Sequence, residues 1–344
     1  MQHKLINTHS TNMNYITHEG GGGNHGHKLK NILSAYIMSQ VYKLTYLHTP
    51  ELITDCFGIG YGENFVPWLD SRKHTLKPPH DTILKIVYIG HFPYISSNHN
   101  ANWYGDVITS DIQTILNSSQ TSNTLFVLRN YLYFPHTFYK SIELGLVLGE
   151  CNYKALENII EKLTFKYSQV NIRDTTQSKQ NVVNIAIQIN RGQDFDKPSY
   201  HKSSRDMRYI FPLEYFSNII NQITTLLKQK NKHSVFHIYT EQYNSEPIIK
   251  HFIGDNINVH VGPNRGSRDD TDLHYCEDVF YHFVNCDILV TCNSSFSVAS
   301  TFFRYKKPFI YYPHLSFEES QFDWAIKTDI SGSFDSEKLL KYIS

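Results

Sequence analysis

The sequence predicts an α/β fold made of two Rossmann-like domains that face each other, and three observations support this prediction. Strand-like apolar runs alternate with segments of helical periodicity in both halves of the chain. The polar segment 173–181 (RDTTQSKQN) interrupts this pattern near the middle. With 344 residues, the chain also exceeds the roughly 250–300 residues at which a single hydrophobic core stops growing. We therefore predict an N-terminal domain over residues 1–175 and a C-terminal domain over 176–344. A single doubly wound domain with insertions is the alternative.

The N-terminal half begins like a parallel βαβ unit. A short strand is predicted to end at Thr17-His18, and the glycine cluster Gly20–Gly23 follows it. Apolar residues at helical spacing then predict a helix over about 27–42, and residues 44–47 have the pattern of the next strand. Further along, we expect a strand at 84–89 and helical structure over about 139–165.

The C-terminal half continues the alternation after the polar segment. Strands are predicted at 182–189, 235–239, 257–261, 287–291 and 309–312, and helices at 212–227, 279–284 and 298–303. The last helix of the chain is a candidate for packing back on the N-terminal domain. In parallel sheets of this kind, ligands bind beyond the carboxyl ends of the strands. The loops that follow these strands are therefore the segments in which we expect functional residues.

Composition and charge exclude several classes of protein. Lys and Arg together number 32, as do Asp and Glu, so the chain lacks the overall positive charge expected of a nucleic-acid-binding protein. The five cysteines are an odd number without a CxxC pair, which argues against a disulfide framework. The first twenty residues have no signal-peptide pattern, and no apolar run reaches the ~18 residues of a membrane helix. We expect a soluble cytoplasmic protein without a transmembrane segment.

The first candidate site is the loop after the strand 182–189, Asn190-Arg191-Gly192-Gln193-Asp194. An arginine binds phosphate with two parallel hydrogen bonds, and a glycine lets backbone N–H groups approach the ligand. The carboxylate of Asp194 can accept a proton. The segment therefore suits an anionic ligand. A surface turn with a solvated ion pair is the alternative.

The second candidate site is the segment Asn293-Ser294-Ser295-Phe296-Ser297, which follows the strand 287–291 and leads into a helix. Hydroxyl groups and free N–H groups at the first turn of a helix can bind an anion together. Alternatively, Ser294 or Ser295 is only the N-cap of that helix.

The third candidate site is the glycine cluster with Asn24. It is neither a GxGxxG fingerprint nor a P-loop, so this segment by itself does not predict a nucleotide site. His25 and His27 follow it, and no metal-binding spacing of His or Cys residues accompanies them. Asp269-Asp270 lies in a polar loop where solvation is the expected role. We therefore predict that no metal is bound.

Taken in order, these segments resemble the motifs of the fucosyltransferase superfamily (α-1,2-, α-1,6- and protein O-fucosyltransferases). Residues 20–24 resemble its GxxGN turn, 188–192 a degenerate form of its HxRRGD motif, and 294–297 its third motif. Residues 208–215 and 237–241 are also similar to catalytic-domain sequences of this group. The resemblance implies a GT-B fold and transfer of L-fucose, with inversion, from GDP-fucose to a glycan hydroxyl. It implies no metal and no cofactor other than the GDP-sugar donor.

The resemblance also implies which residues form the site. Arg191 would neutralise the departing GDP, and Asp194, or Asp196 beside it, would be the base for the acceptor, with His25 or His27 in reserve. The residues expected to bind the donor are Gly23, Asn24, His25, Asn190, Gly192, Arg208, Glu241, Asn293, Ser294, Ser295, Phe296 and Ser297.

Two positions depart from the family pattern. Gln188 stands where the family has histidine, and Asn190 stands where it has its first arginine. Either Arg191 or another basic residue, Arg205 or Arg208, then takes over the missing charge, or the donor is a different nucleotide sugar. A glycan- or nucleotide-binding protein without activity is the third alternative. The abundance of Asn, Ile, Lys and Tyr is typical of AT-rich genomes such as those of giant viruses.

Overall fold

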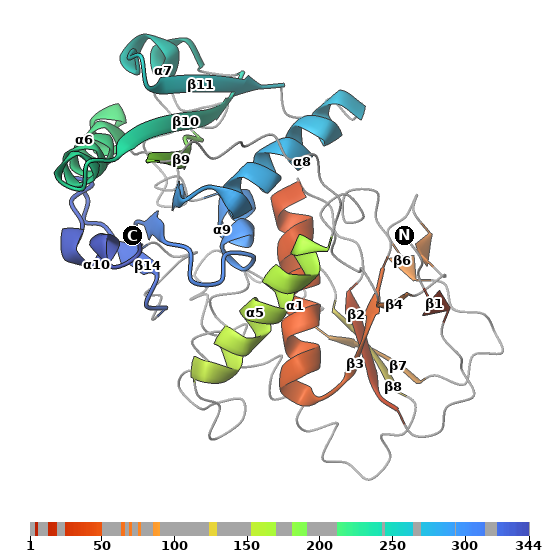
Figure 1. The fold of residues 1–344 in the computed structure, drawn as a ribbon. Coiled ribbons are helices and arrows are strands. Elements are labelled where there is room, and N and C mark those ends of the chain that lie inside the picture. Colours follow the sequence, from red (N-terminus) through yellow and green to blue (C-terminus); the bar gives the residue numbers. More distant parts are fainter. Residues whose placement is uncertain are drawn as a thin grey trace. The chain divides into compact units, whose positions relative to one another are not determined.

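The computed structural model describes residues 4–5, 13–18, 25–49, 63–65, 69–70, 75–76, 85–89, 124–128, 153–169, 181–190, 212–242, 245–263, 270–292, 294–313 and 322–343. The chain divides into two compact units, Met1–Val170 and Asn171–Ser344. Figure 1 labels the elements of both units. Most of the predicted linker 173–181 lies outside the described residues.

The first unit contains a six-stranded sheet in which all neighbouring strands run parallel. Its order is β1-β4-β3-β2-β8-β7. The strands are β1 (Lys4–Leu5), β2 (Tyr15–His18), β3 (Thr45–His48), β4 (Asn64–Phe65), β7 (Lys85–Ile89) and β8 (Thr124–Leu128). A separate antiparallel pair is formed by β5 (Leu69–Asp70) and β6 (Thr75–Leu76). The predicted strand at 84–89 is confirmed as β7, whereas β8 was not predicted.

The helix α1 (His25–Tyr42) connects β2 to its parallel neighbour β3, which confirms the predicted βαβ opening. Every described side chain from residue 32 to residue 39 of α1 is buried. The sheet covers one side of α1, and α5 (Tyr153–Ser168) approaches it through Lys166, whose ammonium lies 5.0 Å from the centre of the Tyr36 ring. Of the predicted helical stretch 139–165, the part before residue 153 lies outside the described residues.

The second unit contains another six-stranded parallel sheet, with the order β11-β10-β9-β12-β13-β14. The strands are β9 (Val182–Gln188), β10 (His233–Glu241), β11 (Ile257–Gly262), β12 (Ile288–Val290), β13 (Phe309–Tyr311) and β14 (Ala325–Lys327). Numbered within this sheet, the order is 3-2-1-4-5-6, which is that of a doubly wound Rossmann sheet. The predictions for β9 to β13 are confirmed, and β14 was not predicted.

One face of this sheet packs against α6 (Leu213–Gln229) and α10 (Ser336–Leu340). Alternate residues of the strands, such as Ile185, Ile187 and Ile238, are fully buried there against the apolar side of α6. Leu339 of α10 and the following Ile343 belong to the same core. The last helix therefore packs within the second unit, although it was considered for packing on the N-terminal domain. The short α7 (Ser245–His251) adds Ile248 to this core.

The other face of the sheet is covered by α8 (Asp270–Asn285) and α9 (Ser295–Thr301). Aromatic rings from the two helices meet edge to face, and Phe283 of α8 also contacts Tyr239 of β10. The predicted helix at 298–303 begins three residues earlier, because Ser294 caps it: its hydroxyl accepts a hydrogen bond from the N–H of Phe296. Helices thus lie on both faces of the sheet (Figure 1).

Arg304 is fully buried, and its hydrogen bonds connect the end of α8 to the segments around β12 and β13. Its guanidinium donates hydrogen bonds to the carbonyl groups of Phe283 and Val284, in the last turn of α8, and to those of Asp287 and Pro308. The last carbonyls of a helix have no partners within the helix, so these bonds complete its C-terminal end.

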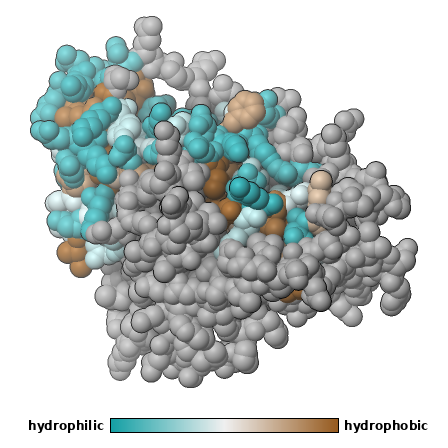
Figure 2. Space-filling view, turned by 90° about the horizontal axis from the view of Figure 1, so that it is seen from below, coloured by the Kyte–Doolittle hydropathy of each residue, from teal (hydrophilic) through white to brown (hydrophobic). Residues whose placement is uncertain are grey.

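Figure 2 shows hydrophilic residues over most of the coloured area of one face, with smaller hydrophobic areas between them. The large hydrophobic side chains that are exposed in the described part of the chain are Met13, Phe165, Ile249, Ile253, Val261 and Ile330. Among the described helices, none combines the length and the apolarity needed to cross a membrane.

Candidate functional site

The candidate site of the second unit lies where the strand order reverses, between β9 and β12. The two strands are parallel neighbours, so the residues that follow them, Ile189-Asn190 and Thr291-Cys292, leave the same edge of the sheet. The helix next along the chain after β9, α6, lies on one face, and the one after β12, α9, lies on the other. In doubly wound sheets, ligands bind at the edge where the connections diverge in this way. The structure therefore brings two of the predicted segments, at 190 and at 294–297, to one place.

Cys292 joins the two sides of this switch point. Its Sγ donates to Oε1 of Gln188 at 3.4 Å. The backbone of Asn190, the backbone of Ser294 and the side chain of Ser297 lie near enough to the sulfur to act against the rise of its pKa. Burial raises the pKa of Cys292 to about 12, so this group stays a neutral thiol at physiological pH. Cys292 is therefore a neutral group that lies near both Asn190 and the start of α9.

The serines at the start of α9 have different surroundings. Ser294 is the N-cap, and Ser297 is buried and donates from its hydroxyl to the carbonyls of Cys292 and Ser294, at 3.3 Å in each case. Ser295 is half-buried at the first position of the helix. The ring of Phe296 packs against Phe280 and Phe283 of α8. Ser294 is therefore the N-cap of α9, which was the alternative role predicted for Ser294 or Ser295.

Asn190 and Glu241 lie on neighbouring strands at the same edge. The register of β9 and β10 pairs Gln188 with Tyr239, and the N–H of Ile189 donates to the carbonyl of Tyr239 at 2.9 Å. Continued by two residues, this register would bring Asn190 level with Glu241, the last residue of β10. Asn190 is 8% exposed, and Glu241 is half-buried. A neutral amide and a carboxylate thus lie at the same end of the sheet.

Three histidines and a tyrosine form a cluster between β10, β11 and α8, on the residues of β10 that precede Glu241. Nδ1 of His237 and Nε2 of His260 are 2.9 Å apart, and the hydroxyl of Tyr239 is 2.5 Å from Nδ1 of His282. Desolvation lowers the pKa of His237 to about 4 and that of His282 to about 3. The imidazoles are therefore neutral near pH 7, and the contacts among them stabilise the packing of α8 on the sheet.

The corresponding edge of the first unit also carries histidines. His18 ends β2, His48 ends β3 and His25 begins α1, so all three belong to the carboxyl end of the sheet. His18 and His48 are 1% and 0% exposed. Next to His18, the hydroxyl of Thr49 donates to the His18 carbonyl at 3.0 Å. Of the described residues at this edge, His25 belonged to the predicted site, with His27 two positions further along α1 as the alternative base.

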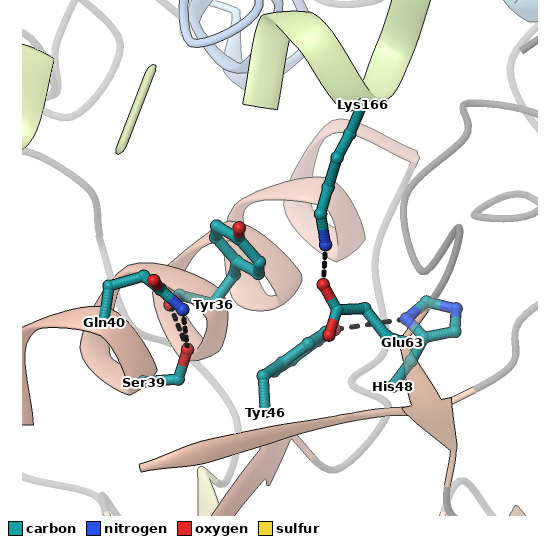
Figure 3. Close-up of polar contacts among 7 residues, drawn as sticks. All are labelled: Tyr36, Ser39, Gln40, Tyr46, His48, Glu63 and Lys166. Atoms are coloured by element: carbon teal, nitrogen blue, oxygen red, sulfur yellow. Dashed lines mark hydrogen bonds and ion pairs between the residues drawn. The ribbon is translucent and has the colours of Figure 1, made fainter. Parts of the chain in front are cut away.

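Figure 3 shows polar contacts of β3, of α1 and of α5 in the first unit. The hydroxyl of Tyr46 is 3.1 Å from Nδ1 of His48, and Lys166 forms an ion pair with Glu63. The Glu63 carboxylate favours the charged ammonium, whereas burial lowers the pKa of Lys166 to about 8. The first contact lies within β3, and the ion pair connects α5 to the residue that precedes β4.

Several predicted site residues lie outside the described residues. They are Gly23, Asn24, Arg191, Gly192, Asp194, Arg208 and Asn293, together with the alternatives Asp196 and Arg205. The roles assigned to them stay predictions. Within the described part of the chain, no group of three or more His, Cys, Asp or Glu side chains could hold a metal ion.

Cys292 and the histidine cluster were missed by the sequence analysis. Cys292 directly follows a predicted strand, but a single buried cysteine has no pattern that distinguishes it from a core residue. His237, His260 and His282 come from three elements, and each by itself resembles an ordinary half-buried residue. The alternation of polar residues at 237, 239 and 241 was the available signal, because it places them on one face of β10.

No protein-family model and no curated protein matches the sequence. Among solved structures, the chain is similar to a mutant of Arabidopsis thaliana FUT1 in complex with GDP, with 14% sequence identity and a TM-score of 0.42. The similarity covers 85% of this chain and 69% of that one.

Proposed function

We propose that this protein is an inverting glycosyltransferase that transfers L-fucose from GDP-fucose to a glycan hydroxyl. The observation that carries the proposal is the meeting of Asn190 and the start of α9 at the switch point of a parallel sheet. The sequence predicts that both segments bind an anion, and both resemble fucosyltransferase motifs. A nucleotide diphosphate is the ligand that this position suits best.

In this proposal the departing GDP is stabilised at the switch point. Arg191, the residue after Asn190, supplies the positive charge, and N–H groups at the start of α9 supply further hydrogen bonds. If the values for oxyanion holes apply, each well-placed donor contributes roughly 3–4 kcal/mol to the transition state. Asp194, or Asp196, takes the proton of the acceptor hydroxyl. No step of this mechanism requires a metal ion.

The first prediction concerns Arg191, which is the only cation in the segment 188–192. Hydrogen bonds to charged groups contribute about 1.5–3 kcal/mol, so Arg191→Ala should lower GDP affinity or turnover roughly 10- to 100-fold. Arg191→Lys should retain only part of the wild-type GDP affinity or turnover, because an ammonium cannot form the paired hydrogen bonds of a guanidinium. Calorimetric titration with GDP measures the affinities. Unchanged GDP binding by Arg191→Ala would show that the donor site is assigned wrongly.

A second candidate function is nucleotide-sugar binding without transfer, or transfer from a different donor. Two observations favour it: Gln188 is engaged with Cys292, and Asn190, which replaces a cation of the motif, is almost fully buried. The variant Asn190→Arg distinguishes a weakened GDP-fucose site from a site for binding alone or for another donor. Asn190→Gln is the uncharged control. If Arg at this position increases transfer from GDP-fucose and Gln does not, Asn190 marks a weakened donor site.

A further inference from the structure

The ends of β10 and β11 lie next to the switch point and form the next part of the same sheet edge. Glu241, the last residue of β10, pairs with Gly262, the last residue of β11. On the other side, the register with β9, continued by two residues, would bring Glu241 level with Asn190. Neighbouring strands are about 4.8 Å apart, so Glu241 is one strand away from the candidate phosphate position.

Tyr275 of α8 completes this part of the edge. Its ring lies against Gly262 so closely that a Cβ atom on that glycine would be 2.6 Å from a ring carbon. Glu241 is near enough to contribute to raising the pKa of Tyr275, although burial and Cys276 contribute more. The Tyr275 hydroxyl is buried, and among the described residues it has no hydrogen-bond partner. A buried hydroxyl of this kind costs free energy unless something binds it.

The charge of Glu241 restricts what can bind beside it. A carboxylate repels phosphate groups, so a nucleotide whose phosphates lie at β9 and β12 must present a neutral part at the end of β10. A carboxylate accepts hydrogen bonds from two donors at once. The 2′- and 3′-hydroxyls of ribose are two adjacent donors, and the ribose follows directly after the phosphates. In doubly wound sheets an acidic residue commonly binds the ribose in this way.

We propose that Glu241 and Tyr275 form the subsite that binds the ribose of the nucleotide. Glu241 accepts hydrogen bonds from the 2′- and 3′-hydroxyls, and the hydroxyl of Tyr275 forms a third hydrogen bond to the sugar. Gly262 is required because a side chain at the end of β11 would displace Tyr275. This inference rests on the proposed function, since it concerns the donor nucleotide of that site. It adds a selection for ribonucleotides over deoxyribonucleotides.

The test is calorimetric titration of the intact chain with GDP, 2′,3′-dideoxy-GDP and inosine diphosphate. The wild type should bind dideoxy-GDP at least about 10-fold more weakly than GDP. Glu241→Gln should weaken GDP binding by a similar factor and leave dideoxy-GDP binding unchanged. Tyr275→Phe should show the same selective loss to a smaller extent. Glu337→Gln, on the exposed side of α10, is the matched control and should behave like the wild type.

The outcomes separate this inference from the proposed function. Equal binding of GDP and dideoxy-GDP by the wild type would overturn the ribose subsite and leave a nucleotide site in place. If Glu241→Gln reduces the preference for GDP over inosine diphosphate, the carboxylate binds the base, and the inference is wrong. If the wild type binds none of GDP, UDP and ADP, the proposed function fails and the inference fails with it. Thermal unfolding of each variant without ligand checks that it is folded.

Discussion

Cys292 illustrates how a single buried side chain can organise a site without taking part in chemistry. Its sulfur donates to Gln188 on one side of the switch point and lies near the start of α9 on the other. The three cysteines of the described part, Cys276, Cys286 and Cys292, are free thiols. They differ in burial, because Cys286 and Cys292 are 3% and 7% exposed, whereas Cys276 on α8 is more accessible.

These differences predict the order in which the three thiols react. Alkylation requires the thiolate, which burial disfavours, and the pKa of Cys292 is raised to about 12. We expect iodoacetamide at pH 8 to label Cys276 in the native protein well before Cys286 and Cys292. Peptide mapping by mass spectrometry measures the labelling, and the protein unfolded in guanidinium is the control in which all react. Equal labelling of Cys276 and Cys292 in the native protein would contradict the burial described above.

Among the elements, the turn after β14 depends on one glycine. Gly332 has φ +88°, and a Cβ atom there would overlap the backbone oxygen of Tyr215 in α6. The carboxylate of Asp329 accepts hydrogen bonds from the N–H groups of Ser331 and Ser333, and Gln222 of α6 donates to the Gly332 carbonyl at 3.0 Å. The turn therefore holds α6 close to the end of the chain.

Gly332→Ala should lower the free energy of unfolding by about 2–4 kcal/mol, because the new side chain combines an unfavourable φ with a backbone overlap. Urea denaturation followed by circular dichroism measures the difference. Gly254→Ala is the matched control, since a Cβ atom at that position would meet its neighbours at 3.5 Å or more. A loss below about 0.5 kcal/mol for Gly332→Ala would mean that the turn can change shape at little cost.

The histidine cluster makes the packing of α8 sensitive to pH. The pKa of His282 is lowered to about 3 by burial and by His237, His260 and Arg304, whereas an unfolded histidine titrates near 6.5. Below pH 6.5 the unfolded chain binds a proton that the folded chain does not, so stability falls as the pH falls. Below a pH of about 3 both states are protonated, and this contribution changes no further.

We expect this histidine to lower the free energy of unfolding by about 2 kcal/mol between pH 7 and pH 5. His282→Gln, which can still accept the hydrogen bond from Tyr239, should make the pH dependence shallower by a similar amount. His233→Gln, at the exposed start of β10, should leave it unchanged. Urea titrations at several pH values measure these slopes. The same slope in wild type and His282→Gln would show that His282 is protonated in the folded protein.

At the scale of the whole molecule, each unit has a parallel sheet and buried helices of its own. The sheet edge proposed to hold the phosphates and the ribose belongs entirely to the second unit. A segment with a complete core can fold alone. We therefore expect residues 171–344 to fold without residues 1–170 and to keep the affinity for GDP.

The measurement is thermal unfolding of the two fragments and of the full chain, with and without GDP. At 100 times its dissociation constant, GDP should stabilise the full chain and the fragment 171–344 by about 2.7 kcal/mol each. The fragment 1–170 is the control and should show no stabilisation. If GDP stabilised only the full chain, residues of the first unit would be required for binding the nucleotide.

The alternation of strands and helices was determined by the sequence alone, because hydrophobic periodicity is a local property. Thus β2, α1 and β3, and the strands β9 to β13, were predicted within a few residues of their bounds. The sequence also predicted the two segments at the switch point as candidate anion sites, because residue types that bind anions directly follow strands there. By contrast, β8 and β14 were missed although β7, β12 and β13, which are as short, were predicted. A short apolar run by itself therefore does not decide whether a strand forms.

Only the tertiary structure decided which strands are neighbours, and this order determines the site. The reversal between β9 and β12 brings together residues that are about a hundred positions apart, such as Gln188 and Cys292. The same order brings Glu241 level with Asn190 and brings three separate histidines into contact under α8. Periodicity does not encode pairing between distant strands, because pairing depends on the burial of whole faces against helices on both sides of the sheet.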